Sequence, residues 1–269
     1  MTDPRFADLR ARVLSALAMV AVGLGALWLG GHVFAALAIA LAGLMGWELY
    51  RMMVPDAPPA RAEAHGVVAA ILVGVFSYTW GGWVSVAGLV VAAALVAARV
   101  PRDPRIFGAY FALILLAAHG LIMLRWDYGL DWVLWLVLVV IASDVAGYFA
   151  GRILGGPKFW PTVSPKKTWS GTVAGWVLGG AVGAAFMPVL GAGAGLILLS
   201  VLLAFAGQMG DIAESAIKRR VGIKDSSDLI PGHGGVLDRF DAMIAVALAA
   251  LLMANLGLLR AVAGAGAAG

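Results

Sequence analysis

Apolar stretches of about 20 residues recur along almost the whole chain, separated by short gaps. A helix needs roughly 20 apolar residues to cross the ~30 Å hydrocarbon core of a bilayer. Nine stretches meet that requirement, at residues 12–30, 32–50, 64–81, 83–99, 106–124, 131–153, 171–190, 194–217 and 239–258. We therefore expect an all-α, polytopic integral membrane protein with about nine transmembrane helices.

Composition narrows the class further. Hydrophobic residues make up 62% of the chain and charged residues 13%, with a mean hydropathy of +0.94, far from a soluble domain. The chain has no cysteine, which excludes disulfides and thiolate metal sites. A pI near 9.6 would suggest nucleic acid binding in a soluble protein. Here the basic residues lie between apolar segments and indicate topology, so no nucleic acid partner is expected.

The basic residues also predict the orientation of the chain. With a cytoplasmic N-terminus, all of the 19 Lys and Arg residues except Arg125 and Arg260 fall on the cytoplasmic side. Adding or removing one helix before the last two would scramble this pattern. Arg5, Arg10 and Arg12 could belong to a signal peptide, but the apolar run that follows is long and lacks a small-residue cleavage site. We expect a retained helix.

Ionisable residues divide the chain unevenly. The first five segments carry few charges outside their loops, whereas the last four carry charges at membrane depth. We predict an N-terminal transmembrane region over residues 1–130, a catalytic transmembrane region over 131–260 and a low-complexity tail over 261–269. Function is expected after about residue 130.

Asp144 is the first candidate site residue, because it lies well inside the sixth segment. An Asp at the centre of a membrane helix costs roughly 2.5 to 3.5 kcal/mol, so it should face a partner or a watery cavity. An interhelical hydrogen bond or salt bridge would also explain it. Its position near the cytoplasmic end, with Arg152 following, favours a site.

The loop from Gly155 to Thr172 is the second candidate. Lys166 and Lys167 precede Thr168 and Ser170 at the expected start of a helix. Hydroxyls and exposed amides at a helix start suit phosphate oxygens. Two lysines in a cytoplasmic loop are equally what topology alone produces, and spacing does not separate the two explanations.

The third candidate is the stretch GQMGDIAESAIKRR. Helical spacing places Asp211, Ser215 and Lys218 on one face, with Glu214 beside them. A carboxylate near the membrane, then a hydroxyl, then cations toward water form a gradient that a metal-bound phosphate could occupy.

A glycine-rich turn, PGHGG, leads from there to Asp238 and Asp241, three residues apart at the start of the last segment. Capping and the helix dipole would explain either aspartate alone. Convergence of Asp211 and Asp238 from two helices is better explained by a hard-cation site, because Mg²⁺ takes few carboxylates plus water and substrate phosphates. His233, between glycines, is either a ligand or general acid, or a residue that bonds to its own turn.

These residues resemble the signature of the CTP-dependent phosphatidate cytidylyltransferases, also called CDP-diacylglycerol synthases. The signature reads S-x-x-K-R-x4-K-D-x7-H-G-G-x2-D-R-x-D. The residues that match it are Ser215, Lys218, Arg219, Lys224, Asp225, His233, Gly234, Gly235, Asp238, Arg239 and Asp241. The similarity takes in SDVAGYFAGR around Asp144 and the SPKKTWSG loop, so it covers roughly residues 140–245. The first five segments match only as a generic hydrophobic region.

The resemblance implies transfer of a cytidylyl group from CTP to phosphatidic acid within the bilayer, giving CDP-diacylglycerol and pyrophosphate. It also implies Mg²⁺ held by Asp211 and Asp238, with a second cation such as K⁺ left open. The implied catalytic residues are Asp144, Ser215, Lys218, Arg219, Lys224, Asp225, His233 and Asp241. Among these, Ser215, Lys218 and Arg219 would meet phosphates, while Lys224 and Asp225 would shape the nucleotide pocket. The implied substrate-binding residues are Lys166, Lys167, Ser170 and Arg239.

The resemblance further implies a homodimer in a bacterial inner membrane, with the active site facing the cytoplasm. A ridge of Gly175, Gly179 and Gly183 permits close helix packing, either between subunits or within one. A CTP-dependent lipid kinase is the nearer alternative function. An ion-coupled anion transporter is more distant, because the charges cluster at one membrane face and no symmetric helix interruptions occur.

Overall fold

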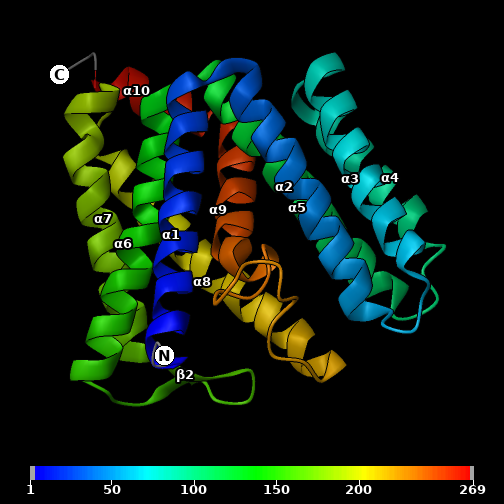
Figure 1. The fold of residues 1–269 in the computed structure, drawn as a ribbon. Coiled ribbons are helices and arrows are strands. Elements are labelled where there is room, and N and C mark those ends of the chain that lie inside the picture. Colours follow the sequence, from blue (N-terminus) through cyan, green and yellow to red (C-terminus); the bar gives the residue numbers. More distant parts are fainter. Residues whose placement is uncertain (1–3, 267–269) are drawn as a thin grey trace. The chain divides into compact units, whose positions relative to one another are not determined.

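The computed structural model describes the backbone of residues 4–266 and the side chains of residues 12–264. This part of the chain is almost entirely helical (Figure 1). The helices are α1 (Pro4–Leu29), α2 (Gly31–Met53), α3 (Pro59–Thr79), α4 (Gly82–Ala97), α5 (Pro104–Asp127), α6 (Leu130–Ile153), α7 (Trp169–Leu190), α8 (Gly195–Val221), α9 (Leu237–Asn255) and α10 (Leu258–Gly266). Two short strands, β1 (Lys158–Trp160) and β2 (Ser164–Thr168), lie between α6 and α7.

Each of the nine predicted segments coincides with one of the helices α1 to α9. Seven of these are long and apolar enough to cross a bilayer, and α9 with α10 forms a further pair that bends by 70° at a short break. Helix α4, at 16 residues, is shorter. The prediction of a polytopic all-α membrane protein is confirmed, while the count of nine spans and their orientation remain predictions. Helix α10 also extends into residues 261–266, where we expected only a low-complexity tail.

The chain forms two compact units, each of which is discontinuous in sequence. The first combines the residues up to Ile122 with Arg220–Phe240, and the second combines Met123–Arg219 with the residues from Asp241 onward. The functional boundary near residue 130 remains a prediction.

In the first unit, α2 packs along α3, which also contacts α4 (Figure 1). Small residues allow the close approach of α2 and α3. A Cβ on Gly46 would lie 2.9 Å from the Cβ of Ala69, and one on Gly66 would lie 2.8 Å from the carbonyl oxygen of Gly43. Nearby, the buried ring of Tyr50 stacks on His65 with a centroid distance of 3.8 Å, so His65 has a packing role.

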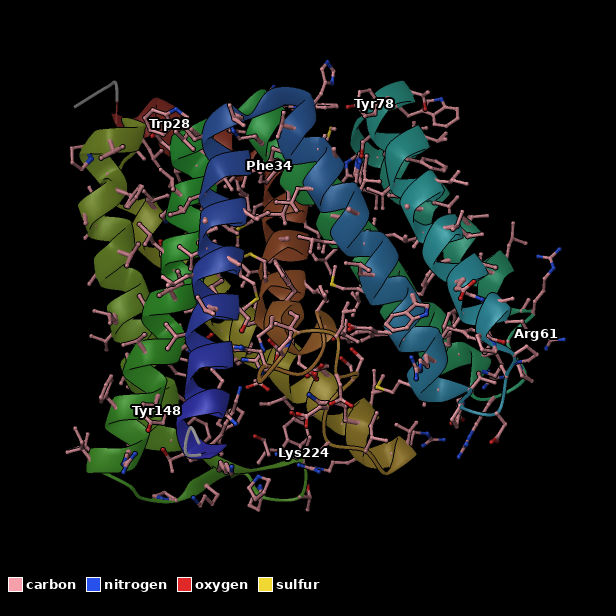
Figure 2. All side chains as sticks on the ribbon, viewed as in Figure 1. Trp28, Phe34, Arg61, Tyr78, Tyr148 and Lys224 are labelled. Carbon is pink, nitrogen blue, oxygen red and sulfur yellow. The ribbon has the colours of Figure 1, made fainter. Side chains whose placement is uncertain are left out.

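Four labelled side chains mark the two ends of the helices in the first unit. Trp28 and Tyr78 lie at one end of its helices, whereas Arg61 and Lys224 lie at the other (Figure 2). Trp28 is 79% exposed and Tyr78 51%, as expected for aromatic rings at a membrane interface. The end with Arg61 and Lys224 is therefore the candidate cytoplasmic end of this unit.

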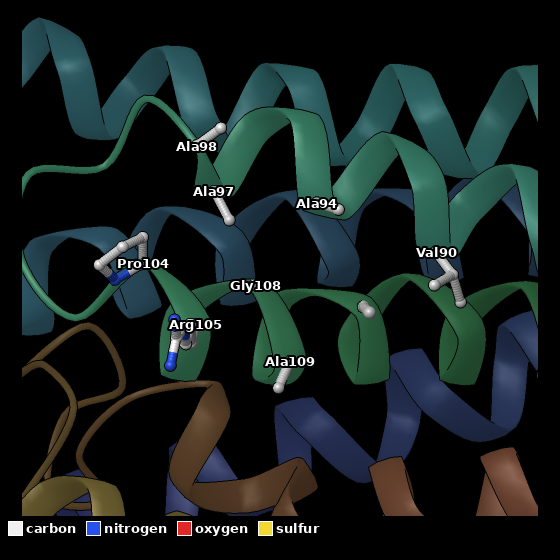
Figure 3. Close-up of a pocket in the computed structure, with 9 residues that line it drawn as sticks. Val90, Ala94, Ala97, Ala98, Pro104, Arg105, Gly108 and Ala109 are labelled. Carbon is white, nitrogen blue, oxygen red and sulfur yellow. The ribbon is translucent and has the colours of Figure 1, made fainter.

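An apolar pocket of about 440 Å³ lies between α4 and α5 (Figure 3). Its walls are mainly small residues, such as Ala94, Ala97 and Gly108, and the one charged residue among those lining it is Arg105. None of the predicted site residues lines this pocket. It lacks the convergent polar groups that phosphate chemistry needs.

In the second unit, α6 packs along α7, and the strands form an antiparallel hairpin that precedes α7 (Figure 1). We predicted only a loop here, and the hairpin that the structure shows is very short. The hairpin places Lys158 opposite Thr168. Thr168 then caps α7, since its hydroxyl accepts a hydrogen bond from the Gly171 amide at 3.2 Å.

The glycine ridge of α7 is buried within the chain. A Cβ on Gly175 would lie 2.6 Å from Nε2 of Gln208, and one on Gly179 would lie 2.9 Å from the Cβ of Ala204. A Cβ on Gly183 would lie 2.9 Å from the carbonyl oxygen of Leu196. The ridge therefore packs on α8 and gives no support to a subunit interface.

Candidate active site

A cavity of about 410 Å³ lies in the second unit, bounded by α6, β2, α7 and α8. The structure brings together here four residues that the sequence predicts for the site, namely Asp144, Lys166, Lys167 and Asp211. Arg152, Ser143, Thr172 and Gln208 also line it. Three elements distant in sequence thus present both charge signs to one cavity.

Close packing of α6 on α7 shapes this cavity. Gly147, Gly151 and Gly171 all line it. A Cβ on Gly171 would lie 2.5 Å from the carbonyl oxygen of Gly147, and one on Gly151 would lie 2.9 Å from the hydroxyl of Thr168. Larger residues would push the helices apart, so glycine here brings the start of α7 and its hairpin close to Asp144.

Lys167 and Asp211 form an ion pair at 2.6 Å. The ammonium group also donates to the main-chain carbonyl of Gln208 at 3.1 Å. The two side chains are 23% and 38% exposed, respectively. The pair is therefore accessible from the cavity, and an anionic ligand could draw the lysine away from the aspartate.

Two further carboxylates lie within electrostatic range of Asp211 in the same unit. Asp144 on α6 interacts with Asp211 and Lys167, and Asp241 on α9 interacts with Asp211, Asp144 and Lys218. Gly210 allows this, because a Cβ there would lie 2.5 Å from the carbonyl oxygen of Asp241. The sequence predicted Asp241 as catalytic but did not predict that it lies near Asp211.

Two residues of α8 have partners on the same helix. The Ser215 hydroxyl donates to Asp211 at 3.3 Å, so it orients that carboxylate. Lys218 pairs at 2.6 Å with Glu214, which is buried. The next residue, Arg219, is exposed. Along α8, a carboxylate is thus followed by a hydroxyl and then by cations, as predicted. The first of these cations, Lys218, has Glu214 as a partner.

Ser170 holds the hairpin to the start of α7. Its hydroxyl donates to the carbonyl oxygen of Gly155 and lies 3.0 Å from that of Thr168. These contacts fasten the two ends of the loop that carries Lys166 and Lys167.

Asp238 lies in the first unit and is only 8% exposed. Its carboxylate accepts hydrogen bonds from the Ser226 amide at 2.9 Å, the Ser226 hydroxyl at 3.1 Å and the Gly235 amide at 2.8 Å. Asp238 thus closes the loop before α9, and both its capping role and its metal role stay predictions. Because Asp211 belongs to the second unit, their shared cation site remains a prediction.

His233 bonds to residues of the first unit. Its Nδ1 lies 3.0 Å from the Ser15 hydroxyl and 3.4 Å from the carbonyl oxygen of Pro231. These contacts join His233 both to α1 and to its own turn, and its role as a ligand or general acid stays a prediction. The neighbouring predicted residues Lys224, Asp225 and Arg239 are exposed.

Sequence reasoning missed Gln208, a polar residue on the cavity wall. Its side-chain amide donates to the carbonyl oxygen of Thr172 at 3.1 Å, and its oxygen accepts from the Trp176 indole at 3.0 Å. The available signal was a polar residue one helical turn before Asp211 in an apolar segment. It also missed Glu48 on α2, which has the same signal: a polar residue in an apolar segment.

The chemistry of the donors bears on whether a metal could bind. Among the described residues, no group of three or more His, Asp or Glu side chains is arranged to hold an ion. Mg²⁺ commonly binds through one or two carboxylates, with water and substrate phosphates completing its shell. Asp211, partly exposed on the cavity wall, fits that pattern.

Comparisons with known proteins agree with the motifs around this cavity. The model of the cytidylyltransferase family matches residues 10–256. A phosphatidate cytidylyltransferase of Brucella suis is 35% identical over 249 residues, covering 89% of this chain and 91% of the relative. The enzyme of the same name from Helicobacter pylori is 47% identical over 130 residues, 47% of this chain and 48% of that protein. One from Bacillus subtilis is 39% identical over 123 residues, 45% of this chain and 46% of that protein.

Proposed function

Because the chain belongs to the cytidylyltransferase family and is therefore a nucleotidyltransferase, we propose that it joins CTP and phosphatidic acid into CDP-diacylglycerol and pyrophosphate. A phosphate oxygen of phosphatidic acid attacks the α-phosphorus of CTP and forms a new P–O bond. The bond from that phosphorus to the oxygen bridging it to the β-phosphate breaks, and pyrophosphate leaves. The comparisons give no support to a lipid kinase or a transporter.

The observation that carries this proposal is the charged cavity of the second unit. The attacking oxygen is already anionic near neutral pH, so no strong general base is needed. The main obstacle is repulsion between two anionic substrates, and fixed cations overcome it. Lys166 and Lys167 from β2 and Arg152 from α6 supply such cations to the cavity lining. We assign Lys167 to a CTP phosphate, since it already turns toward an oxyanion, the carboxylate of Asp211.

The remaining cavity carboxylates have separate roles in this proposal. Asp144 lines the same cavity from α6 and attracts the Lys167 ammonium electrostatically. Asp241 lies within electrostatic range of Asp211 from α9. Ser170 acts through the loop it fastens, and Ser215 acts through the carboxylate it contacts.

For the cofactor we propose Mg²⁺, with Asp211 and Asp238 as its protein ligands. Such an ion would neutralise phosphate charge and polarise the phosphorus under attack. Asp211 is accessible from the cavity. Asp238 accepts hydrogen bonds mainly at Oδ2, and a carboxylate has about four acceptor positions, so those bonds are compatible with a cation. A second cation such as K⁺ stays an open part of this proposal.

We also propose a homodimer in the inner membrane, with the cavity facing the cytoplasm. The location is supported by the distribution of Lys and Arg between the apolar segments. The dimer rests on the family resemblance, since the α7 ridge is occupied by α8.

The direct test is product analysis. Purified protein in mixed micelles is incubated with labelled CTP, phosphatidic acid and Mg²⁺. We expect CDP-diacylglycerol and pyrophosphate in equal amounts. Release of CDP with a phosphorylated lipid would replace the proposal with a lipid kinase. Asp127→Asn, an exposed carboxylate of the second unit that does not line the cavity, serves as the control variant with unchanged activity.

A further inference from the structure

Glu48 is a buried carboxylate in the apolar helix α2. It is 0% exposed, and an ionised carboxylate in that setting requires strong hydrogen-bond partners. All of its partners come from one segment of the first unit, Ser226–Leu237. Its two oxygens accept from the Ser227 hydroxyl at 2.6 Å, the Val236 amide at 2.9 Å, the Leu237 amide at 2.6 Å and the Ser226 hydroxyl at 3.4 Å.

Two of these partners are main-chain amides at the start of α9. The first amides of a helix have no partner within the helix, and the positive end of its dipole lies there. Glu48 satisfies two of them from a different helix. It therefore acts as a capping carboxylate supplied by α2, about 190 residues away in sequence.

The contacts of Glu48 join directly to those of Asp238. The Ser226 hydroxyl lies within reach of both carboxylates, at 3.4 Å from Glu48 and 3.1 Å from Asp238. Gly235 lies between them, and a Cβ there would lie 2.5 Å from Oε1 of Glu48. Gly234, with a φ of +80°, completes the turn. The turn that contains Gly234 and Gly235 of the family signature is thus held by two carboxylates, Glu48 and Asp238.

We propose that Glu48 is a positioning residue of the active site, which sets the turn from Ser226 to Leu237 and thereby the direction of the Asp238 carboxylate. This inference rests on the proposed function, in which Asp238 holds Mg²⁺. It extends the functional machinery into the N-terminal region, where the family signature has no residue.

The decisive variant is Glu48→Gln, which keeps the shape of the side chain but has one acceptor oxygen instead of two. The Val236 and Leu237 amides bond to different oxygens of Glu48, so at least one amide must lose its partner. Glu63→Gln, an exposed glutamate on α3, is the matched control. Ser227→Ala, which removes a single donor, is the graded variant.

Hydrogen exchange by mass spectrometry is the first measurement, because it does not depend on activity. For Glu48→Gln we expect at least about tenfold faster exchange in peptides covering 226–238, with α6 and α7 peptides unchanged. Ser227→Ala should show a smaller increase, and Glu63→Gln none. Equal loss of protection in all peptides would make Glu48 a general stability residue and overturn the proposal, as would unchanged exchange at 226–238.

Kinetics are the second measurement. A displaced Asp238 should lower kcat by at least about tenfold and raise the Mg²⁺ concentration needed for half-maximal rate, while KM for phosphatidic acid changes by less than about threefold. Gly235→Ala should reproduce this pattern from the other side of the contact. Unchanged kcat and Mg²⁺ dependence in both variants would contradict the positioning role. A wild-type protein without cytidylyl transfer would instead contradict the proposed function, and the exchange result would still stand alone.

Discussion

Both units contain carboxylates that the proposals assign to the active site, but the groups that surround these carboxylates differ between the units. In the first unit, Glu48 and Asp238 are almost fully buried and are bonded to amides and hydroxyls of the turn before α9. In the second unit, Asp144 and Asp211 line a cavity, and Asp211 pairs with the flexible side chain of Lys167. A carboxylate held by main-chain donors fixes structure, whereas one held by a lysine can exchange partners with a ligand.

Asp211→Asn should give the largest effect and the clearest separation of the two kinds of carboxylate. It removes charge from the cavity while keeping volume, so cytidylyl transfer should fall by at least about 100-fold. Thermal unfolding should change little, because partly exposed ion pairs contribute less than about 1 kcal/mol. Initial rates and melting temperature are measured together. A melting temperature far below that of the wild type would show that Asp211 fixes structure, as Glu48 and Asp238 do.

Asp238→Ala should differ from Asp211→Asn by lowering thermal stability as well as activity. It leaves the Ser226 and Gly235 amides without their acceptor, and each buried unsatisfied group costs about 1–3 kcal/mol. We expect a clear loss of thermal stability besides any loss of activity. Asp228→Ala, an exposed aspartate in the same loop, is the control that should melt like wild type. If both variants were equally stable, the distinction between the units would not hold.

Lys167→Met should have an intermediate effect on activity. It tests whether the Lys167 ammonium leaves Asp211 to bind a phosphate of CTP. Met keeps most of the length without the charge, so we expect KM for CTP to rise by about tenfold, equivalent to about 1.4 kcal/mol. Steady-state kinetics over a range of CTP concentrations give the value. Lys158→Met lies on the same hairpin but outside the cavity and should leave KM unchanged. Equal effects of the two substitutions would indicate general electrostatics.

Asp103→Asn should have the smallest effect. Two hydrogen bonds from Arg220, at 2.9 and 3.0 Å, hold the pKa of Asp103 below its usual value. A lowered folded-state pKa contributes stability above the usual Asp pKa, and that contribution is lost as the pH falls through the lowered value. The variant should therefore melt no more than roughly 2 °C below wild type, by a constant amount between pH 5 and 8. A difference that changes across this range would assign the pH dependence to another group.

The fold class was predictable because membrane crossing imposes a length and polarity on each segment, and every predicted segment became a helix. Asp144 was predictable for the same reason, since a carboxylate at that depth needs a polar environment. Its neighbours Lys166 and Lys167 were predicted from a loop before a helix start. These inferences use only local sequence and the properties of the bilayer.

The partners of each charge were less predictable, because hydrogen bonds between distant segments depend on how the helices pack. Glu48 has the same local signal as Asp144, a carboxylate in an apolar segment, yet its donors lie some 180 residues later. The α7 ridge had two possible partners, and only packing on α8 decides between them. The hairpin was missed because three and five residues carry too little periodicity.

In the proposed site, the ion pair between Lys167 and Asp211 would also make two binding events cooperative. A phosphate that takes Lys167 leaves Asp211 with an unbalanced negative charge, which raises its affinity for a cation. A cation at Asp211 releases Lys167 for a phosphate in the same way. Linkage requires the two enhancements to be equal, so the nucleotide and its counter-ion should each bind more tightly when the other is present.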